Sequence, residues 1–218
     1  MSEQKKFAII LSGCGVYDGS EIHEATLSML AVARAGAGYE LFAPDMEQTQ
    51  VINHLTGQAS QEKRNVLVES ARIARGKISD LREYIATDYD ALILPGGFGA
   101  AKNLSSFAYE GANCSVNPEV EKALRDTVTA GKPVGALCIA PVILARILKQ
   151  ATVTIGRDRQ TAAAVVSMGG IHQPAGHAEV VIDEKYKIVT TPCYMLDATI
   201  DRIADGTEKM VRALIELM

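Results

Sequence analysis

Tryptophan is absent from this sequence of 218 residues, and aromatic side chains make up only 5% of it. The net charge at pH 7 is −4, and no basic patch with interleaved aromatic residues occurs. Nucleic-acid-binding domains usually carry such a patch, so we expect no nucleic acid partner. No stretch approaches the roughly 20 consecutive apolar residues that a membrane-spanning helix requires. We therefore expect no membrane partner either.

Cysteine is scarce and widely spaced, at Cys14, Cys114, Cys138 and Cys193, with no C-x-x-C pair. This spacing argues against a disulfide framework and against a zinc ribbon, and we expect no metal site. A protein with free thiols fits a reducing compartment. From this we predict a cytoplasmic enzyme.

Low-complexity linkers and internal repeats are also missing, and nothing in the chain suggests a second core. The hydrophobic content of 48% and the charged content of 22% are ordinary for a globular protein. A chain of this length is long enough for one sizeable α/β domain. We predict a single domain over residues 1–218.

Short apolar runs alternate with segments of helical spacing along the chain. The pattern predicts strands over 7–11, 39–43, 51–54, 91–94 and 152–155 and a hairpin over 179–190. It predicts helices over 21–35, 61–75, 100–105, 118–130, 139–148, 161–168 and 198–217, the first of them capped by Ser20. Such alternation indicates an α/β fold with a mostly parallel sheet, covered by helices on both faces. Functional groups in such sheets gather beyond the carboxyl ends of the strands.

A further apolar run, which we predict to be a buried strand, passes directly into the helix predicted over 139–148, and Cys138 lies at that junction. The run follows Gly131-Lys132-Pro133, and Pro141 is acceptable in the first turn of the helix that follows. A single-residue strand-to-helix turn pushes its side chain out above the sheet edge, as in nucleophile-elbow hydrolases. A helix N-terminus behind the sulfur would favour the thiolate. The competing interpretation is a free cysteine buried as a small hydrophobe.

Two further loops should reach the same sheet edge as Cys138. They cover residues 13–20, after the first strand, and residues 95–103, after the strand at 91–94. The second loop begins with Pro95-Gly96-Gly97, which predicts a tight turn whether or not it has a functional role.

At these residues the chain resembles the ThiJ/PfpI superfamily, whose fold is flavodoxin-like and class I glutamine-amidotransferase-like. The resemblance lies in 94–103 (LPGGFGAAKN), in 136–141 (ALCIAP) and in His23-Glu24. The stretches 12–24 and 51–57 resemble the ElbB branch in particular. That branch is described as a glyoxalase connected with isoprenoid biosynthesis.

The resemblance implies a set of site residues. Cys138 takes the place of the nucleophilic, oxidisable cysteine, and Glu24 takes that of the glutamate that hydrogen-bonds the sulfur. Gly96 and Gly97 match glycines whose N–H groups face the thiol, and Ile139 completes an oxyanion-binding set of amides. By pattern alone, Glu24 is a solvated carboxylate in the first turn of a helix, and its assignment to the site rests on the resemblance.

Other residues are candidates for lining the pocket, namely Cys14, His54, Asn103 and Cys193. For Cys14 the alternative is a small residue in a tight turn, and for His54 it is a structural loop histidine. Ile139 stands where many relatives have a histidine, so the resemblance does not supply a Cys–His pair. His172 and His177 are left without an assigned position.

The resemblance implies a glutathione-independent glyoxalase that converts small 2-oxoaldehydes through a Cys138 hemithioacetal, giving glycolate from glyoxal and lactate from methylglyoxal. This chemistry needs no metal or organic cofactor. Two alternatives stay open: an amidotransferase or amidohydrolase using His177-Ala178-Glu179, and a redox-sensing, chaperone-like protein. Relatives are commonly dimeric, so we expect a homodimer.

Overall fold

Seven strands form one central sheet in the order β10-β11-β7-β6-β1-β2-β5 in the computed structural model, which describes residues 4–218. Every neighbouring pair is parallel except β10 and β11. The strands are β1 (Lys6–Ile10), β2 (Gly38–Ala43), β5 (Ser79–Asp80), β6 (Ala91–Leu94), β7 (Val134–Leu137), β10 (Val181–Asp183) and β11 (Ile188–Thr191). The run β2-β1-β6-β7-β11 has the strand order of a doubly wound, flavodoxin-like sheet. The predicted α/β fold is confirmed.

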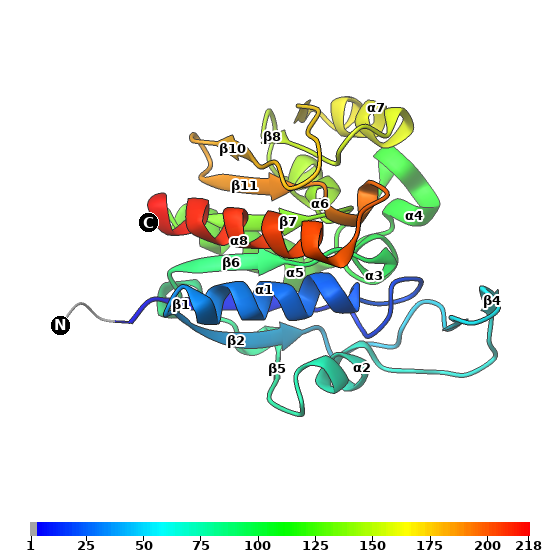
Figure 1. Cartoon of the computed structure of the whole chain (residues 1–218). Helices are drawn as coiled ribbons and strands as arrows, with labels where there is room; N and C mark the ends of the chain where they lie inside the picture. Colours follow the sequence, from blue (N-terminus) through cyan, green and yellow to red (C-terminus); the bar gives the residue numbers. More distant parts are fainter. Residues whose placement is uncertain (1–3) are drawn as a thin grey trace.

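Helices cover both faces of this sheet. Figure 1 shows α1 (Ile22–Arg34) and α8 (Ile200–Glu216) side by side in front of the sheet, with α5 (Pro118–Thr129) behind it. The shorter helices are α2 (Val66–Ile73), α3 (Phe98–Lys102), α4 (Phe107–Glu110), α6 (Pro141–Ile147) and α7 (Arg159–Ser167). Because both faces are covered, the central strands are apolar along their whole length, with every residue of β6 and β7 buried.

Two short β-pairs lie outside the central sheet. The pair β3 (Ile52–Asn53) and β4 (Gln58–Ala59) is antiparallel, and the pair β8 (Thr152–Val153) and β9 (Ile171–His172) is parallel. The strand predicted over 152–155 therefore exists but does not join the main sheet. The predicted hairpin over 179–190 is confirmed as β10 and β11.

The helix predicted over 61–75 is shorter in the structure, because its first residues pair with another segment. The N–H of Gln48 donates to the carbonyl of Arg64 at 2.7 Å, and Glu47 forms a β-bridge with Asn65. Helix α2 begins only after Asn65, whose side chain accepts the N–H of Val68 at 3.0 Å. Helical spacing in the sequence did not reveal this competing backbone pairing.

The first helix also begins differently from the prediction. Ser20 does not cap it; its hydroxyl instead accepts the N–H of Ser12 at 2.8 Å. The cap is Glu21, whose carboxylate accepts the N–H of Glu24 at 2.7 Å. This one-residue shift brings a second carboxylate beside Glu24.

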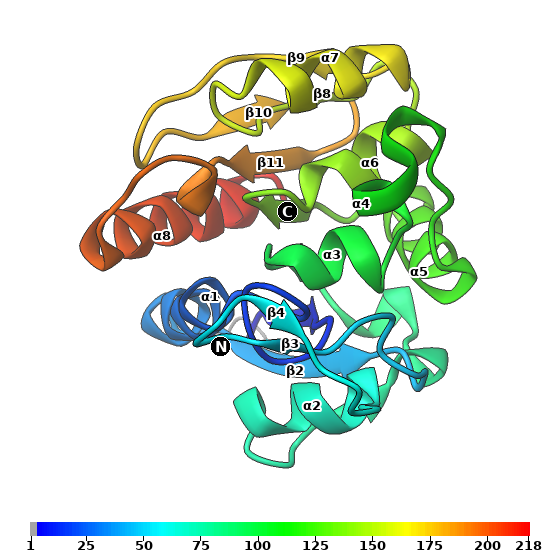
Figure 2. The same cartoon turned by 90° about the vertical axis from the view of Figure 1, so that its right-hand side faces the viewer.

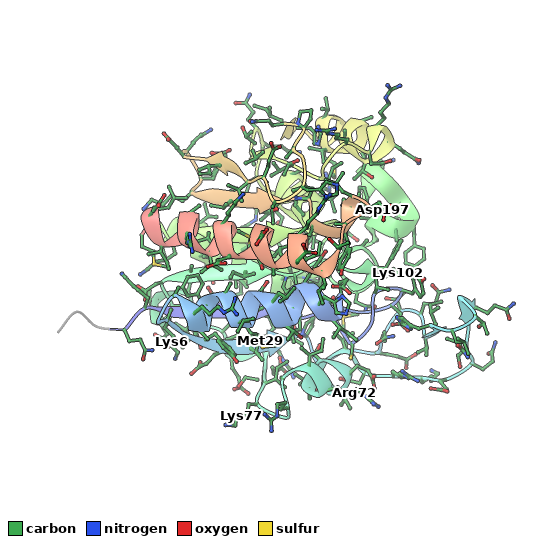
Figure 3. All side chains as sticks on the ribbon, viewed as in Figure 1. Lys6, Met29, Arg72, Lys77, Lys102 and Asp197 are labelled. Carbon is green, nitrogen blue, oxygen red and sulfur yellow. The ribbon has the colours of Figure 1, made fainter. Side chains whose placement is uncertain are left out.

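The carboxyl ends of the parallel strands share one edge of the molecule. Figure 2 looks onto this edge, with α3 near its centre. In Figure 3, Lys102 and Asp197 lie at this edge, whereas Lys6 lies at the opposite end, where β1 begins. Among the described residues, no helix has the length and apolar character needed to cross a membrane.

Candidate active site

Cys138 occupies the turn between β7 and α6, as the sequence predicts. Its N–H donates to the carbonyl of Thr191 on β11 at 3.0 Å, so the β-ladder continues into this residue. Its φ is +60°, in the left-handed region that residues with a Cβ rarely adopt. Strain of this kind costs on the order of 1–3 kcal/mol and gathers at functional sites.

The sulfur does not stand exposed above the sheet as expected. The Cys138 side chain is 7% exposed and packs in the apolar cluster between the sheet, α1 and α8. It nevertheless has polar partners: the N–H groups of Gly97 and Ile139 and the carboxyl of Glu24 each form a hydrogen bond with the sulfur. The interpretation of Cys138 as a mere small hydrophobe does not account for these three partners.

Glu24 reaches the sulfur from the first turn of α1 and is fully buried. Its Oε2 accepts the N–H of Gly96 at 2.9 Å, and its Oε1 accepts the N–H of Tyr194 at 3.2 Å. The alternative of a solvated carboxylate is therefore wrong. In a helical projection, a polar face that points to water looks the same as one that points to a buried polar site.

Burial and the charge of Glu21 raise the pKa of Glu24 to about 8, against the smaller opposing effect of its backbone donors. A buried carboxyl resists ionisation because its charge is poorly solvated. Glu24 therefore carries a proton at neutral pH. In that state it donates to the sulfur and places no negative charge beside it.

Burial also raises the pKa of the Cys138 thiol, and an ionised Glu24 raises it further. The N–H groups of Gly97 and Ile139 oppose both effects. The prediction of a lowered thiol pKa is therefore wrong. Helix α6 begins at Pro141, three residues after Cys138, so its N-terminus is not directly behind the sulfur. Desolvation of the sulfur outweighs the effect of the two amides. Cys138 and Glu24 act as a coupled pair, in which ionisation of the sulfur is easiest while Glu24 keeps its proton.

Gly96 differs from the role the resemblance implies. Its N–H serves Glu24, so the amides that face the sulfur are those of Gly97 and Ile139. A Cβ on Gly96 would lie 2.6 Å from Glu24 Oε2 and 3.0 Å from Cys138 Sγ. Gly96 is needed so that the carboxyl and the sulfur approach the same stretch of backbone.

Asn103 and His54 both hold loops rather than contact the sulfur. Asn103 Nδ2 donates to the carbonyls of Ser12 and Asp18, each at 2.9 Å. His54 accepts the N–H of Tyr17 through Nε2 at 3.2 Å, and its Nδ1 lies 3.0 Å from the carbonyl of Ile52. These bonds require the neutral tautomer with the proton on Nδ1.

Of the two remaining pocket candidates, Cys14 lies away from the site and Cys193 lies beside it. The charges that act on the thiol of Cys14 belong to Glu69, Arg72, Asp18 and Arg64, a set without Glu24 or Cys138, so Cys14 belongs to a different environment. Cys193 is 5% exposed and interacts with the charges of both Glu24 and Cys138. The structure therefore brings Cys193, but not Cys14, to the site.

Sequence reasoning assigned no role in the site to three residues around Glu24. Tyr194, in the short 3₁₀ turn η4 (Cys193–Met195), supplies a backbone donor to Glu24, and its hydroxyl lies 2.9 Å from His23 Nδ1. Glu21 Oε1 lies 3.9 Å from the same nitrogen of His23. The available signals were that Glu21 and His23 lie within three positions of Glu24 and that His23 belongs to the motif His23-Glu24.

The fold and this site define an α/β protein with a buried cysteine–carboxyl pair at the carboxyl edge of a flavodoxin-like sheet. A profile described as the DJ-1/PfpI family matches residues 16–191. The chain belongs to the DJ-1/PfpI family, which confirms the superfamily suggested by the motifs.

Individual relatives agree with this assignment. The human glutamine amidotransferase-like class 1 domain-containing protein 3, mitochondrial, is 49% identical over 97% of this chain and 83% of its own length. The rat ES1 protein homolog, mitochondrial, is 48% identical over 97% of this chain and 84% of its own. The structure of an isoprenoid biosynthesis protein with an amidotransferase-like domain, from Ehrlichia chaffeensis, covers 98% of this chain and all of its own, with 36% identity and a TM-score of 0.91.

The names of the human and rat relatives correct one prediction. Both are mitochondrial proteins, which contradicts the cytoplasmic location expected from the free thiols. Free cysteines indicate a reducing compartment but do not tell one reducing compartment from another.

Proposed function

We propose that this protein is a glutathione-independent glyoxalase that converts small 2-oxoaldehydes to 2-hydroxy acids. The observation that carries the proposal is the buried pair of Cys138 and Glu24, joined by a hydrogen bond and flanked by the amides of Gly97 and Ile139. The reaction requires a nucleophile, one group that both gives and accepts a proton, and donors for an oxyanion. Cys138 is the nucleophile, Glu24 is the proton-transfer group, and the N–H groups of Gly97 and Ile139 are the two donors.

The reaction begins when the Cys138 thiol releases its proton to water and the resulting thiolate adds to the aldehyde carbon. Glu24 gives its proton to the alkoxide oxygen that forms, and the product is a neutral hemithioacetal. The N–H groups of Gly97 and Ile139 stabilise the developing negative charge on that oxygen.

Glu24, now a carboxylate, removes the hydrogen of the former aldehyde carbon as a proton. An enediol forms, and Glu24 returns the proton to the neighbouring carbon. The former aldehyde carbon is oxidised to a thioester while its neighbour is reduced to an alcohol, so no external oxidant or cofactor takes part. Water then hydrolyses the thioester to a 2-hydroxy acid and restores the thiol.

The pKa of Glu24, about 8, suits both proton transfers. A general acid–base group works best when its pKa lies near the working pH, because both forms are then available. A glutamate with its ordinary pKa of 4.5 would hold almost no proton to donate at neutral pH.

The exposure of Cys138, only 7%, favours small substrates. Glyoxal and methylglyoxal need to bring only one aldehyde carbon to the sulfur. A peptide or other bulky amide would have to displace the segments that cover the site.

The test is acid production from glyoxal and methylglyoxal. Cys138→Ser should abolish turnover, and Glu24→Gln should lower kcat by about 10²–10⁴-fold, the usual contribution of one general acid–base group. Cys114→Ser is the matched control, since Cys114 is also buried but lies against Met168 on the other face of the sheet. Full turnover in Cys138→Ser would refute the proposal.

An amidotransferase would use His177 and Glu179 beside the cysteine. Glu179 instead accepts the N–H of Gly176 within its own loop, and among residues 4–218 no hydrogen bond joins it to His177. Ammonia release from glutamine that depends on His177 would favour this second function over the first. The Ehrlichia relative suggests a further link to isoprenoid biosynthesis, and the expected homodimer stays a prediction.

A further inference from the structure

Two cysteines stand at the ends of neighbouring strands in this site. Cys138 follows β7 and Cys193 follows β11, and these two strands are parallel neighbours. The last registered pair is Leu137 with Thr191, and the N–H of Cys138 still bonds to the carbonyl of Thr191. Cys138 is thus one residue beyond the registered ladder, and Cys193 is two residues beyond it.

The spacing of the strands sets the distance to expect between the two Cα atoms. Neighbouring strands lie about 4.8 Å apart and rise about 3.3 Å per residue, so residues one step apart in register are separated by about 6 Å. Disulfides join Cα atoms roughly 4.4–6.8 Å apart. At Pro192 the chain leaves the extended conformation (φ −72°, ψ −26°), so this spacing applies to the strand ends that carry the pair and not to Cys193 itself.

Both side chains also face the same layer of the protein. Cys138 and Cys193 belong to the apolar cluster between the sheet and helices α1 and α8. Each has a positive φ, +60° for Cys138 and +42° for Cys193. Side chains of a regular strand alternate between faces, so the turn at Cys138, directly after Leu137 of the same cluster, returns its side chain to the face of Glu24.

Burial, followed by the charges of Glu24 and Cys138, raises the pKa of the Cys193 thiol well above its ordinary value, so Cys193 carries its proton. It packs near Gly206 of α8, whose absent Cβ would lie 3.9 Å from the Cys193 sulfur. Glu24 accepts the N–H of Tyr194, the residue after Cys193, at 3.2 Å and also hydrogen-bonds the Cys138 sulfur, so the same carboxyl joins the two cysteine-bearing turns. Cys193 is not needed for the proton transfers of the proposed reaction.

We propose that Cys138 and Cys193 are a redox pair that reduces hydrogen peroxide and closes into an intramolecular disulfide. The Cys138 sulfur attacks one peroxide oxygen, the O–O bond breaks, and Cys138 sulfenic acid and hydroxide form. The Cys193 sulfur then attacks the sulfenic sulfur, displaces its oxygen as water once protonated, and forms the S–S bond. In total, two thiols and one peroxide give one disulfide and two waters.

This inference rests on the nucleophilic Cys138 that the proposed function also requires, but it does not require glyoxalase turnover. A disulfide protects Cys138 from further oxidation to the sulfinic and sulfonic acids, of which the sulfonic is irreversible. It also ties η4, which carries the Tyr194 donor to Glu24, to the turn that carries the nucleophile. Peroxide should therefore switch the site off in a form that a dithiol restores.

The experiment treats the reduced full-length protein with one to ten equivalents of hydrogen peroxide and measures the intact mass and the non-reduced tryptic peptides. The four cysteines fall in four different tryptic peptides, covering 7–34, 103–122, 126–146 and 188–202. We expect a loss of about 2 Da and a cross-link between peptides 126–146 and 188–202, both reversed by dithiothreitol. Cys193→Ser and Cys193→Ala should instead gain about 32 Da at Cys138, the mass of a sulfinate.

Cys114→Ser is the control and should form the same cross-link as the unsubstituted protein. The inference is overturned if Cys138 of the unsubstituted protein becomes a sulfinate while Cys193 stays a free thiol. It is equally overturned by a cross-link to Cys14 or between two chains, or by no oxidation at all. A cross-link without glyoxal turnover would support the redox pair and reject the proposed function, and turnover without a cross-link would do the reverse.

Discussion

The buried, protonated carboxyl of Glu24 has a measurable effect on the stability of the whole protein. Its pKa rises from an ordinary value of 4.5 to about 8 on folding. The folded state therefore binds a proton that the unfolded chain has already released between these two values. Stability linked to Glu24 is fully present below pH 4.5 and is lost as the pH rises toward 8.

The magnitude follows from that one proton. Each pH unit inside the window costs about 1.4 kcal/mol. Between pH 5 and 7 the loss amounts to about 2.5 kcal/mol, a large part of a typical free energy of unfolding of about 5–15 kcal/mol.

Glu24→Gln removes the ionisable group while it keeps an oxygen for a backbone donor. The free energy of unfolding of the unsubstituted protein, minus that of Glu24→Gln, should fall by about 2.5 kcal/mol between pH 5 and 7. Urea denaturation followed by circular dichroism at half-unit pH steps measures this difference.

Ser28→Ala is the matched control for this measurement. Ser28 is buried on the same helix and donates to the carbonyl of Glu24 at 2.7 Å, but it has no ionisable group in this range. Its difference in stability from the unsubstituted protein should not change with pH. A flat or rising difference for Glu24→Gln would refute the assignment of a neutral Glu24 at pH 7.

Three further substitutions test the structure around the site. Gly96→Ala should abolish turnover and lower stability by about 2 kcal/mol or more, because the added Cβ would meet both the sulfur and the carboxyl. The control is Gly38→Ala, where the nearest atom is 4.0 Å away and the loss should be less than about 1 kcal/mol. Thermal denaturation measures the stability of both variants, and the glyoxal assay measures their turnover. Asn103→Ala removes three hydrogen bonds that hold the loops over the sheet edge and should lower stability by about 2–4 kcal/mol while it increases proteolysis of those loops. Tyr84→Phe removes only the 2.7 Å hydrogen bond to the Thr127 hydroxyl, so urea denaturation should show a loss of stability of about 1–2 kcal/mol. Turnover should not change, and a clear loss of turnover would contradict the separation of Tyr84 from the site.

The order of strands and helices could be predicted from the sequence because buried strands are composed of apolar residues. The runs at 7–11 and 91–94 are apolar throughout since helices cover both faces of the sheet, and β6 matches its predicted range residue for residue. The beginnings of α1 and α2 were misplaced for a different reason. They depend on competing hydrogen bonds, of Ser20 with Ser12 and of Gln48 with Arg64, which helical spacing does not reveal.

The same distinction applies to the site. Local order predicted Cys138 in a strand-to-helix turn, and the resemblance supplied Glu24. Burial of both groups, the use of the Gly96 N–H by Glu24, and the contribution of Tyr194 became visible only in three dimensions. Tyr194 lies 170 positions from Glu24 and acts through its backbone, so no side-chain pattern would have indicated it.

The backbone bond from Cys138 to Thr191 fixes how the site can move. The Cys138 amide is bonded one residue past the last registered pair of the central sheet, so its hydrogen should exchange slowly, when this end of the sheet opens. Any opening that admits a substrate must then come from the segments above it, namely η4 and the stretch around α3. Cys138 is therefore held in place by the sheet, and the segments around η4 and α3 are the ones that move when a substrate enters.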